Sequence, residues 1–405
     1  MNGYQNDLGR VAEGLLASAV FRGVLDKPLF THFLGFCSPA RTREERLADY
    51  GKFVAEIYDA GGDLADAVRR IVFENENVYV VTCANGNAVP SPIRDSAARE
   101  LTLLSDFAAL TAADFAAALE NGAERDTKST EDLLPHYVAE RVDLAAEYEA
   151  RLCEIGKHGY GIFASHGMFR LDAEGEILPV ESADPITMEQ FIGYESERAQ
   201  VLANTKALLE GRPAANALLC GDAGTGKSST VKAVANYLFD EGLRLIEVRK
   251  DQLFHLPRIM GRIRHNPLKF ILFIDDLSFD RNDDCFGMLK AILEGSASAK
   301  APNAVIYATS NRRHMVRETF GDREGGDVHR NDSMQETMSL SERFGLVVRF
   351  YRPEKKLYLD IVHELAARHG ITRDRELLDV EAEAFALRRG YRSARCAEQF
   401  IKSLL

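Results

Sequence analysis

A glycine-rich stretch from Leu218 to Thr230, "LLCGDAGTGKSST", constrains the fold more than any other part of this chain. Its centre fits the pattern G-x-x-x-x-G-K-[ST] in full, between an apolar run typical of a buried strand and a run with helical spacing. Glycines let the backbone N–H groups turn inward around phosphates, and the following helix points its positive dipole end at them. The residues predicted to hold nucleotide phosphates are Gly221, Asp222, Ala223, Gly224, Thr225, Gly226, Lys227, Ser228 and Ser229.

Two acids at the end of a second apolar run predict a Mg²⁺ site beside this loop. In "KFILFIDDL" the run ends at Asp275 and Asp276, and carboxyl ends of parallel strands meet at one edge of a sheet. We expect Ser228 and Asp275 to ligate Mg²⁺, the latter directly or through water, and Lys227 to reach the β/γ-phosphates. Asp276 is then the candidate that orients or activates an attacking water.

A third apolar run, "VIYATSN", ends in Asn311. On a strand next to the one that ends at Asp275, the Asn311 amide would reach the γ-phosphate or the attacking water. The alternative is that Asn311 only ends a strand.

The rhythm of the sequence predicts three domains. Residues 1–182 show mainly helical periodicity, with a probable β-hairpin in "YGIFASHGMFRLDAEGEILPVE" near their end. Residues 183–352 alternate apolar runs with helical runs, which predicts an α/β core with a parallel sheet flanked by helices. Residues 353–405 are again helical and are predicted to form a small lid.

Charge is divided unevenly along the chain. Residues 1–185 hold 17 Lys/Arg against 31 Asp/Glu, a balance of −14, whereas the remainder is at +2 and the whole chain at −12. An acidic N-terminal half would repel nucleic acid and suit a basic partner, although a well-solvated surface explains it as well.

Cysteine spacing and hydropathy predict a cytoplasmic protein without a membrane partner. The six cysteines show no CxxC or Cys/His metal spacing, so buried free thiols in a reducing compartment are expected. No apolar run approaches the roughly 18 to 20 residues that span a bilayer. The first ten residues lack the basic and apolar pattern of a secretory signal.

Together these motifs resemble AAA+ ATPases in content and order. The segments "GDAGTGKSS", "LIEVRKDQL", "DDLSF", "LKAILEG", "IYATSNRRH", "SLSERFGL" and "RGYRSARCAEQF" resemble most closely a bacterial AAA+ family catalogued as a domain of unknown function. The resemblance is close from Ala183 to Leu405. It implies a P-loop α/β core with a helical lid that binds Mg·ATP.

The resemblance also assigns roles to individual residues. Asn311 matches the sensor 1 asparagine, and Arg343 in "SERF" matches the arginine finger that reaches the γ-phosphate held by a neighbouring subunit. A homo-oligomer, either ring or filament, is therefore expected. Arg395 resembles the sensor 2 arginine of the lid, with Arg392 as the alternate. The segment that usually lines the adenine pocket matches Ile192, Gly193 and Tyr194.

Three functions remain open from the sequence. The leading hypothesis is an ATPase whose hydrolysis cycle drives conformational change in an oligomer acting on an unidentified client. The main alternative is an ATP-switched loader or adaptor with little turnover, because many AAA+ ATPases have Asp-Glu where this chain has Asp275-Asp276. A small-molecule P-loop kinase is the third, disfavoured by the order of the later motifs.

Two basic clusters leave a nucleic-acid partner possible without indicating one. They are "RIMGRIRHNPLK" and "NRRHMVR", and no aromatic residues interleave with their charges.

Overall fold

The computed structural model describes residues 4–120, 130–181, 185–278, 284–294, 301–311 and 342–405. The chain divides into two compact units, Met1–Ser165 and His166–Leu405. Each unit has a hydrophobic core of its own, and each is described here by itself.

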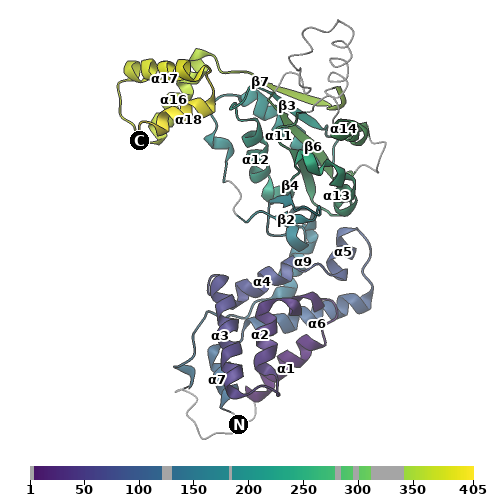
Figure 1. Cartoon of the computed structure of the whole chain (residues 1–405). Helices are drawn as coiled ribbons and strands as arrows, with labels where there is room; N and C mark the ends of the chain where they lie inside the picture. Colours follow the sequence, from purple (N-terminus) through teal and green to yellow (C-terminus); the bar gives the residue numbers. More distant parts are fainter. Residues whose placement is uncertain (1–3, 121–129, 182–184, 279–283, 295–300, 312–341) are drawn as a thin grey trace. The chain divides into compact units, whose positions relative to one another are not determined.

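The first unit is helical, which confirms the expectation for the N-terminal region (Figure 1). Short polar caps delimit its helices; Thr42, for example, forms a capping box with Glu45 at the start of α3. The α-helices described in this unit are α1 (Tyr4–Leu16), α2 (Pro28–Cys37), α3 (Arg43–Asp59), α4 (Leu64–Glu74), α5 (Val78–Ala84), α6 (Ser91–Ala108), α7 (Ala112–Leu119), α9 (Leu144–Cys153) and α10 (Ile155–His158).

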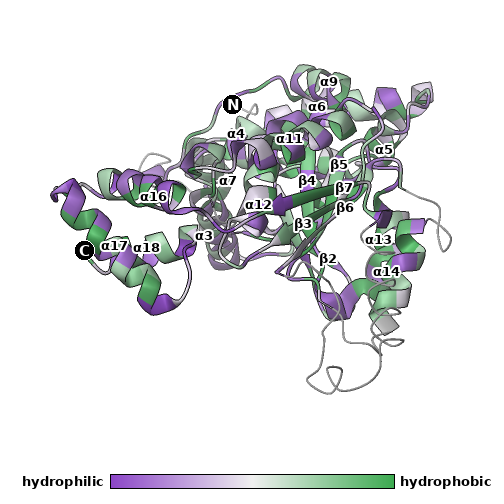
Figure 2. Ribbon diagram, turned by 90° about the horizontal axis from the view of Figure 1, so that it is seen from above, coloured by the Kyte–Doolittle hydropathy of each residue, from purple (hydrophilic) through white to green (hydrophobic). Residues whose placement is uncertain are grey.

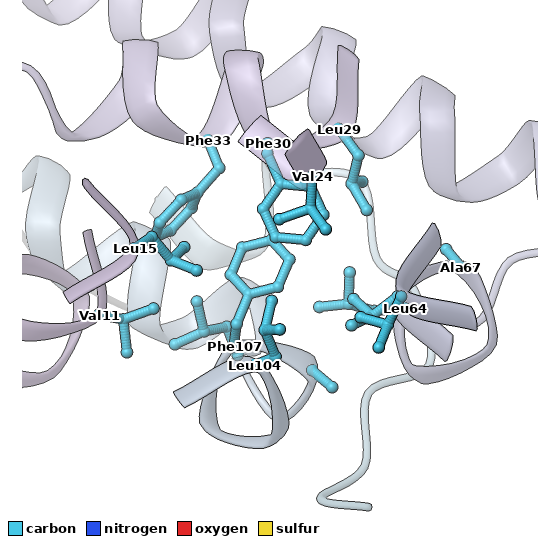
Figure 3. Packing of buried hydrophobic residues seen from close by; sticks show 14 of the residues in the cluster. Val11, Leu15, Val24, Leu29, Phe30, Phe33, Leu64, Ala67, Leu104 and Phe107 are labelled. Carbon is cyan, nitrogen blue, oxygen red and sulfur yellow. The ribbon is translucent and has the colours of Figure 1, made fainter. Parts of the chain in front are cut away.

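Aromatic rings from four helices form the centre of this unit's core. Phe107 of α6 lies 4.7 Å from Phe30 and 4.8 Å from Phe33 of α2, measured between ring centroids. Figure 3 shows the Phe107 ring directed between α2 and the aliphatic side chains around it. Phe53 of α3 and Phe115 of α7 complete the cluster, and all five rings are fully buried. These contacts hold α2, α3, α6 and α7 together.

The second unit is built on a seven-stranded sheet with the order β2-β1-β4-β5-β6-β3-β7. All neighbouring strands pair in parallel except β1 and β2. Helices α11 and α12 lie on one side of the sheet and α13 and α14 on the other (Figure 1). The bounds are β1 (Met168–Leu171), β2 (Ile177–Pro179), β3 (Ala217–Gly221), β4 (Leu243–Glu247), β5 (Lys269–Ile274), β6 (Ala304–Ser310), β7 (Leu346–Phe350), α11 (Glu195–Leu209), α12 (Lys227–Tyr237), α13 (Leu256–Ile263) and α14 (Asp284–Glu294).

The central strands are apolar because helices cover both of their faces. In β5 every residue from Phe270 to Ile274 is fully buried, and Figure 2 shows the strands of this sheet coloured mainly hydrophobic. The predicted α/β class with a parallel sheet is therefore confirmed.

The predicted hairpin exists, but its assignment to the N-terminal domain is wrong. β1 pairs in parallel with β4, matching Met168 with Leu245 and Arg170 with Glu247, so the hairpin extends the sheet of the second unit. The boundary between the units accordingly follows Ser165 and not residue 182. Alternating residues predict a strand, but they do not tell which sheet its backbone N–H and C=O groups join.

The C-terminal residues form a small helical lid, as the sequence predicts, and the structure shows that it contains three helices. Helices α16 (Lys355–Arg368), α17 (Arg375–Arg389) and α18 (Ala394–Lys402) share a small core around the buried side chains of Tyr358, Val362 and Phe400. By its contacts the lid is grouped with the sheet in the second unit.

No single helix among the described residues is long and apolar enough to cross a membrane. Helices α6 and α7 meet the length and composition test only as a pair, which is bent by 84° at its break. The apolar side chains of this pair, Phe107 and Phe115 among them, are buried within the first unit.

We expect Phe107→Ala to lower the free energy of unfolding by about 3–5 kcal/mol, because the lost ring leaves a cavity among packed aromatics. Urea unfolding followed by circular dichroism measures this. Leu133→Ala, at a side chain 82% exposed, is the control and should cost under about 0.5 kcal/mol. Equal costs for the two variants would contradict the described core.

Candidate active site

The phosphate loop lies between the end of β3 and the start of α12, as predicted. Gly221 is confined by its neighbour strand: its φ is +143°, and a Cβ at this position would lie 1.9 Å from the carbonyl oxygen of Phe350 in β7. Gly224 and Gly226 also have positive φ angles of 76° and 89°. Only glycine combines such backbone angles with so close an approach, so the loop conformation depends on these three positions.

The ammonium group of Lys227 is the centre of a hydrogen-bond network within this loop. The side chain is only 5% exposed, and its Nζ donates to the carbonyl oxygens of Gly221 at 3.1 Å and Asp222 at 2.7 Å. It also donates to Oδ1 of Asn311 at 3.0 Å. Burial lowers the pKa of Lys227, and the nearby carboxylates, led by that of Asp222, oppose this shift. The site therefore holds a desolvated cation that an anionic ligand would stabilise.

Asp275 and Ser228 lie together, as the predicted Mg²⁺ site requires. The Ser228 hydroxyl donates to Oδ1 of Asp275 at 2.5 Å, and the Thr309 hydroxyl donates to the same oxygen. No group of three His, Cys, Asp or Glu side chains that would hold a metal by itself occurs among the described residues. A pair of oxygen ligands nevertheless suits Mg²⁺, which is usually bound by one or two protein oxygens together with substrate phosphates and water.

Asn311 links the second acid of the pair to Lys227. Its Nδ2 donates to Oδ1 of Asp276 at 2.7 Å, while its Oδ1 accepts from Lys227. The backbone N–H of Asp276 donates to the Thr309 hydroxyl at 2.9 Å. The φ angle of Asp276 is +53°, a left-handed conformation that is uncommon outside glycine. The fold thus brings Lys227, Ser228, Asp275, Asp276 and Asn311 into one connected cluster.

Arg343 is not brought to the phosphate loop of its own chain. It precedes β7, whose other end at Phe350 pairs with Gly221. Five strand residues span roughly 13 Å, so Arg343 lies near the amino ends of the strands, whereas the phosphate loop lies at their carboxyl ends. There its guanidinium is held by Glu294 at the end of α14, with Nε 2.6 Å from Oε1.

The two candidate lid arginines have different surroundings. Arg392 donates twice to the Glu383 carboxylate, at 2.8 and 2.6 Å, and this hydrogen bonding raises the pKa of Arg392. Arg395 has an exposed side chain, and its backbone N–H donates to the carbonyl oxygen of Gly224 at 3.3 Å. The lid therefore contacts the phosphate loop at Arg395, while Arg392 is engaged within the lid.

The segment predicted to line an adenine pocket lies between the lid and the sheet. Ile192 packs against the lid core, and a Cβ on Gly193 would lie 2.5 Å from the lid residue Leu357. Tyr194 has a φ of 59°, and its hydroxyl donates to the Tyr351 carbonyl at 2.6 Å. This segment thus contacts both the lid and the end of β7.

Three residues near the loop were not singled out by the sequence motifs. Thr309 orients Asp275, Arg352 donates to Asp222 Oδ1 at 2.9 Å, and the Phe191 ring lies against Gly226. Thr309 lies within the recognised segment "YATSN" and Arg352 is the last residue before the predicted lid, but neither position signals a partner. Only the pairing of β7 with β3 shows that Arg352 is close to Asp222.

In the basic cluster between Arg258 and Lys269 two of the arginines form ion pairs. Arg258 and Arg262 both bind the Glu176 carboxylate, Arg262 at 2.7 Å. The second cluster, Arg312 to Arg317, lies outside the described residues.

Comparison with known proteins gives one family match and several proteins with partial similarity. The model of a family described as "Protein of unknown function (DUF815)" matches residues 164–405. A curated protein, heat shock protein 104 of Schizosaccharomyces pombe, is 25% identical over 202 residues, covering 42% of this chain and 21% of that protein. This chain therefore spans about a fifth of the length of that relative.

Two solved structures show likeness at low identity. The RuvB Holliday junction branch migration motor of Thermotoga maritima is 16% identical, with a TM-score of 0.36, covering 54% of this chain and 63% of that chain. AMPPCP-bound DnaA from Aquifex aeolicus is 20% identical, with a TM-score of 0.37, covering 55% and 66%.

We expect Gly221→Ala to abolish binding of a fluorescent ATP analogue and to destabilise the second unit, since the added Cβ meets the backbone of Phe350. Gly261→Ala is the matched control: this helical position has nothing within 4 Å of an added Cβ, so stability should stay equal or rise by up to about 1 kcal/mol. Normal nucleotide binding by Gly221→Ala would refute the described loop.

Proposed function

This chain belongs to the DUF815 family of proteins of unknown function, and on that premise we propose that it is a AAA+-type ATPase that binds and hydrolyses Mg·ATP. One observation carries the proposal: Lys227, Asn311 and Asp276 form a continuous hydrogen-bonded chain beside the Ser228–Asp275 pair, at the end of a complete phosphate loop. A loop that only bound phosphate would not require a carboxylate and an amide poised next to the lysine.

In the proposed mechanism the buried Lys227 ammonium and the loop N–H groups bind the β- and γ-phosphates. Ser228 and Asp275 would hold Mg²⁺, which when bound neutralises negative charge on the phosphates. Since Lys227 already lacks full solvation, it gives up little hydration when phosphate oxygens replace its present acceptors.

Asn311 would change partners when ATP binds. In the structure described here its side-chain amide is hydrogen-bonded to both Lys227 and Asp276. A γ-phosphate would compete for the Lys227 ammonium and the Asn311 amide, which leaves the Asp276 carboxylate free to accept a proton from water. Arg395, whose backbone already contacts Gly224, would bring a second positive charge from the lid.

We propose that the active form is a homo-oligomer, a ring or a filament. The support is the position of Arg343: it lies near the amino ends of the strands, away from the phosphate loop of its own chain at their carboxyl ends. An arginine finger at this position would serve the nucleotide of a neighbouring subunit. The proposed client is a protein of unidentified kind. The proposed location is the cytoplasm, supported by six cysteines, all among the described residues and none in a disulfide.

The competing proposal is an ATP-switched binding protein with little turnover. It is favoured by the short Asp276 side chain, which is held by Asn311 on a left-handed backbone. Hydrolysis would then be slow, and bound ATP itself would set the conformation. A small-molecule kinase would be revealed by a phosphorylated acceptor in place of free phosphate.

We expect Arg343→Ala to reduce the steady-state rate of phosphate release by about 10³-fold or more, as loss of a trans-acting arginine does, while ATP binding is retained. The wild-type rate per subunit should rise with protein concentration, and that of the variant should not. Arg99→Ala, an exposed arginine of α6, is the control and should behave as wild type. Tight ATP binding without phosphate release by the wild type would favour the switch.

The lowered pKa of Lys227 predicts a pH dependence of binding. The charged form of Lys227 binds phosphate, so affinity for a fluorescent ATP analogue should fall as pH rises. The fall should begin at a lower pH than it would for an ordinary lysine, whose pKa is about 10.4. Lys227→Arg is the control, because an arginine stays protonated throughout this range. If affinity falls in parallel for both proteins, a group other than Lys227 titrates.

A further inference from the structure

Helix α17 of the lid carries an apolar stripe that faces solvent. Leu377, Val380 and Leu387 are 53%, 67% and 75% exposed, and Ala384 between them is also exposed. Their spacing of three, four and three residues places them along one side of the helix. Tyr391, just beyond the helix, continues the stripe at 40% exposure.

The opposite side of the same helix already fills the lid core. Leu378, Ala382 and Ala386 are buried there, each within 4% exposure. Because successive helical residues are about 100° apart, the buried and exposed stripes lie on opposite faces. Hydrophobic residues accordingly recur around α17 in Figure 2. A surface helix normally presents polar residues on its outer face, so a second apolar stripe marks a contact surface.

A hollow of about 270 Å³ adjoins the C-terminal end of this stripe. Leu387, Tyr391 and Pro353 give it an apolar lining, and the guanidinium groups of Arg352 and Arg392 add positive charge. It therefore suits an apolar side chain flanked by acidic groups.

One charged residue near each end of α17 is placed to pair with a second copy. The N-terminal end carries Asp374 and Glu376 together with Arg373 and Arg375, but Arg373 pairs with Glu381 and Arg375 bonds to His363. No ion pair to another described residue involves Glu376 near this end or Arg388 near the other. Two antiparallel copies would set Glu376 of each copy beside Arg388 of the other, and their helix dipoles would also be antiparallel.

We propose that α17 of one copy packs antiparallel against α17 of a second copy of this chain. The contact is isologous, with Leu377 opposite Leu387 and Val380 opposite Ala384 in both directions. The N-terminal end of each helix, with Glu376 and Leu377, enters the hollow on the other copy. This stripe-to-stripe contact gives a two-fold dimer and is distinct from the edge of the sheet at which Arg343 lies.

The contact also borders the nucleotide site. Arg352, which lines the hollow, donates to Asp222 of the phosphate loop. Docking of Glu376 from the other copy beside Arg352 therefore competes with Asp222 for the same guanidinium in each copy.

Sedimentation velocity of the full chain tests the proposal over a range of concentrations. The wild type should shift toward dimer as concentration rises, with association detectable by about 100 µM. Val380→Glu should weaken dimerisation about tenfold or more, because it places a charge in the stripe without disturbing the lid core. Leu133→Glu, at an even more exposed apolar site in the first unit, should dimerise as wild type.

Two results would overturn the contact. One is a wild type that stays monomeric at about 100 µM; the other is a Val380→Glu chain that associates as well as wild type. If Arg343→Ala alone abolishes association, the α17 contact fails while the proposed ATPase stands. If α17 variants alone abolish it and no ATP is hydrolysed, the contact stands and the proposed function fails.

Charge exchange and cross-linking determine the orientation. Glu376→Arg and Arg388→Glu should each weaken dimerisation, and the two together should restore it. In a Cys153→Ser background, mixing a Leu377→Cys chain with a Leu387→Cys chain should give mixed disulfide dimers in excess over like pairs. Preferential like-with-like cross-linking would indicate a parallel contact and overturn the proposal.

Discussion

The geometry of the phosphate site depends on the hydrogen bonds that the buried ammonium of Lys227 donates. A charge removed from water must be compensated, and here the carbonyls of Gly221 and Asp222 and the amide oxygen of Asn311 do so. These partners come from the loop and from the end of β6. The same ammonium therefore sets the loop conformation and brings the end of β6 to the phosphate site.

Strand β7 connects several functional parts of the second unit. Its carbonyl at Phe350 approaches Gly221 so closely that no side chain fits between them, and Arg352 just beyond it binds Asp222. Arg343 lies before its other end, bound to Glu294. A shift of this strand would therefore affect the loop, the start of the lid and the proposed arginine finger together.

Some of these residues could be predicted from the sequence and others could not, because some depend on local patterns and others on contacts between distant strands. The loop, Asp275, Asp276 and Asn311 were predictable because a local pattern places each at the carboxyl end of a strand. The hairpin was predicted but assigned to the wrong domain, since its pairing with β4 joins residues over 70 positions apart. Arg352 and Thr309 were not singled out, because their partners lie on other strands.

The phosphate loop, the α/β sheet and the helical lid were all predictable from the amino-acid sequence. Local periodicity and motif spacing are sufficient for that, because they are properties of neighbouring residues. The packed structure was needed to show that Arg392 is bound to Glu383 while Arg395 contacts the loop, and that α17 has a second apolar face directed to solvent. Burial and pairing depend on residues far apart in the chain, so they become visible only when the elements are packed.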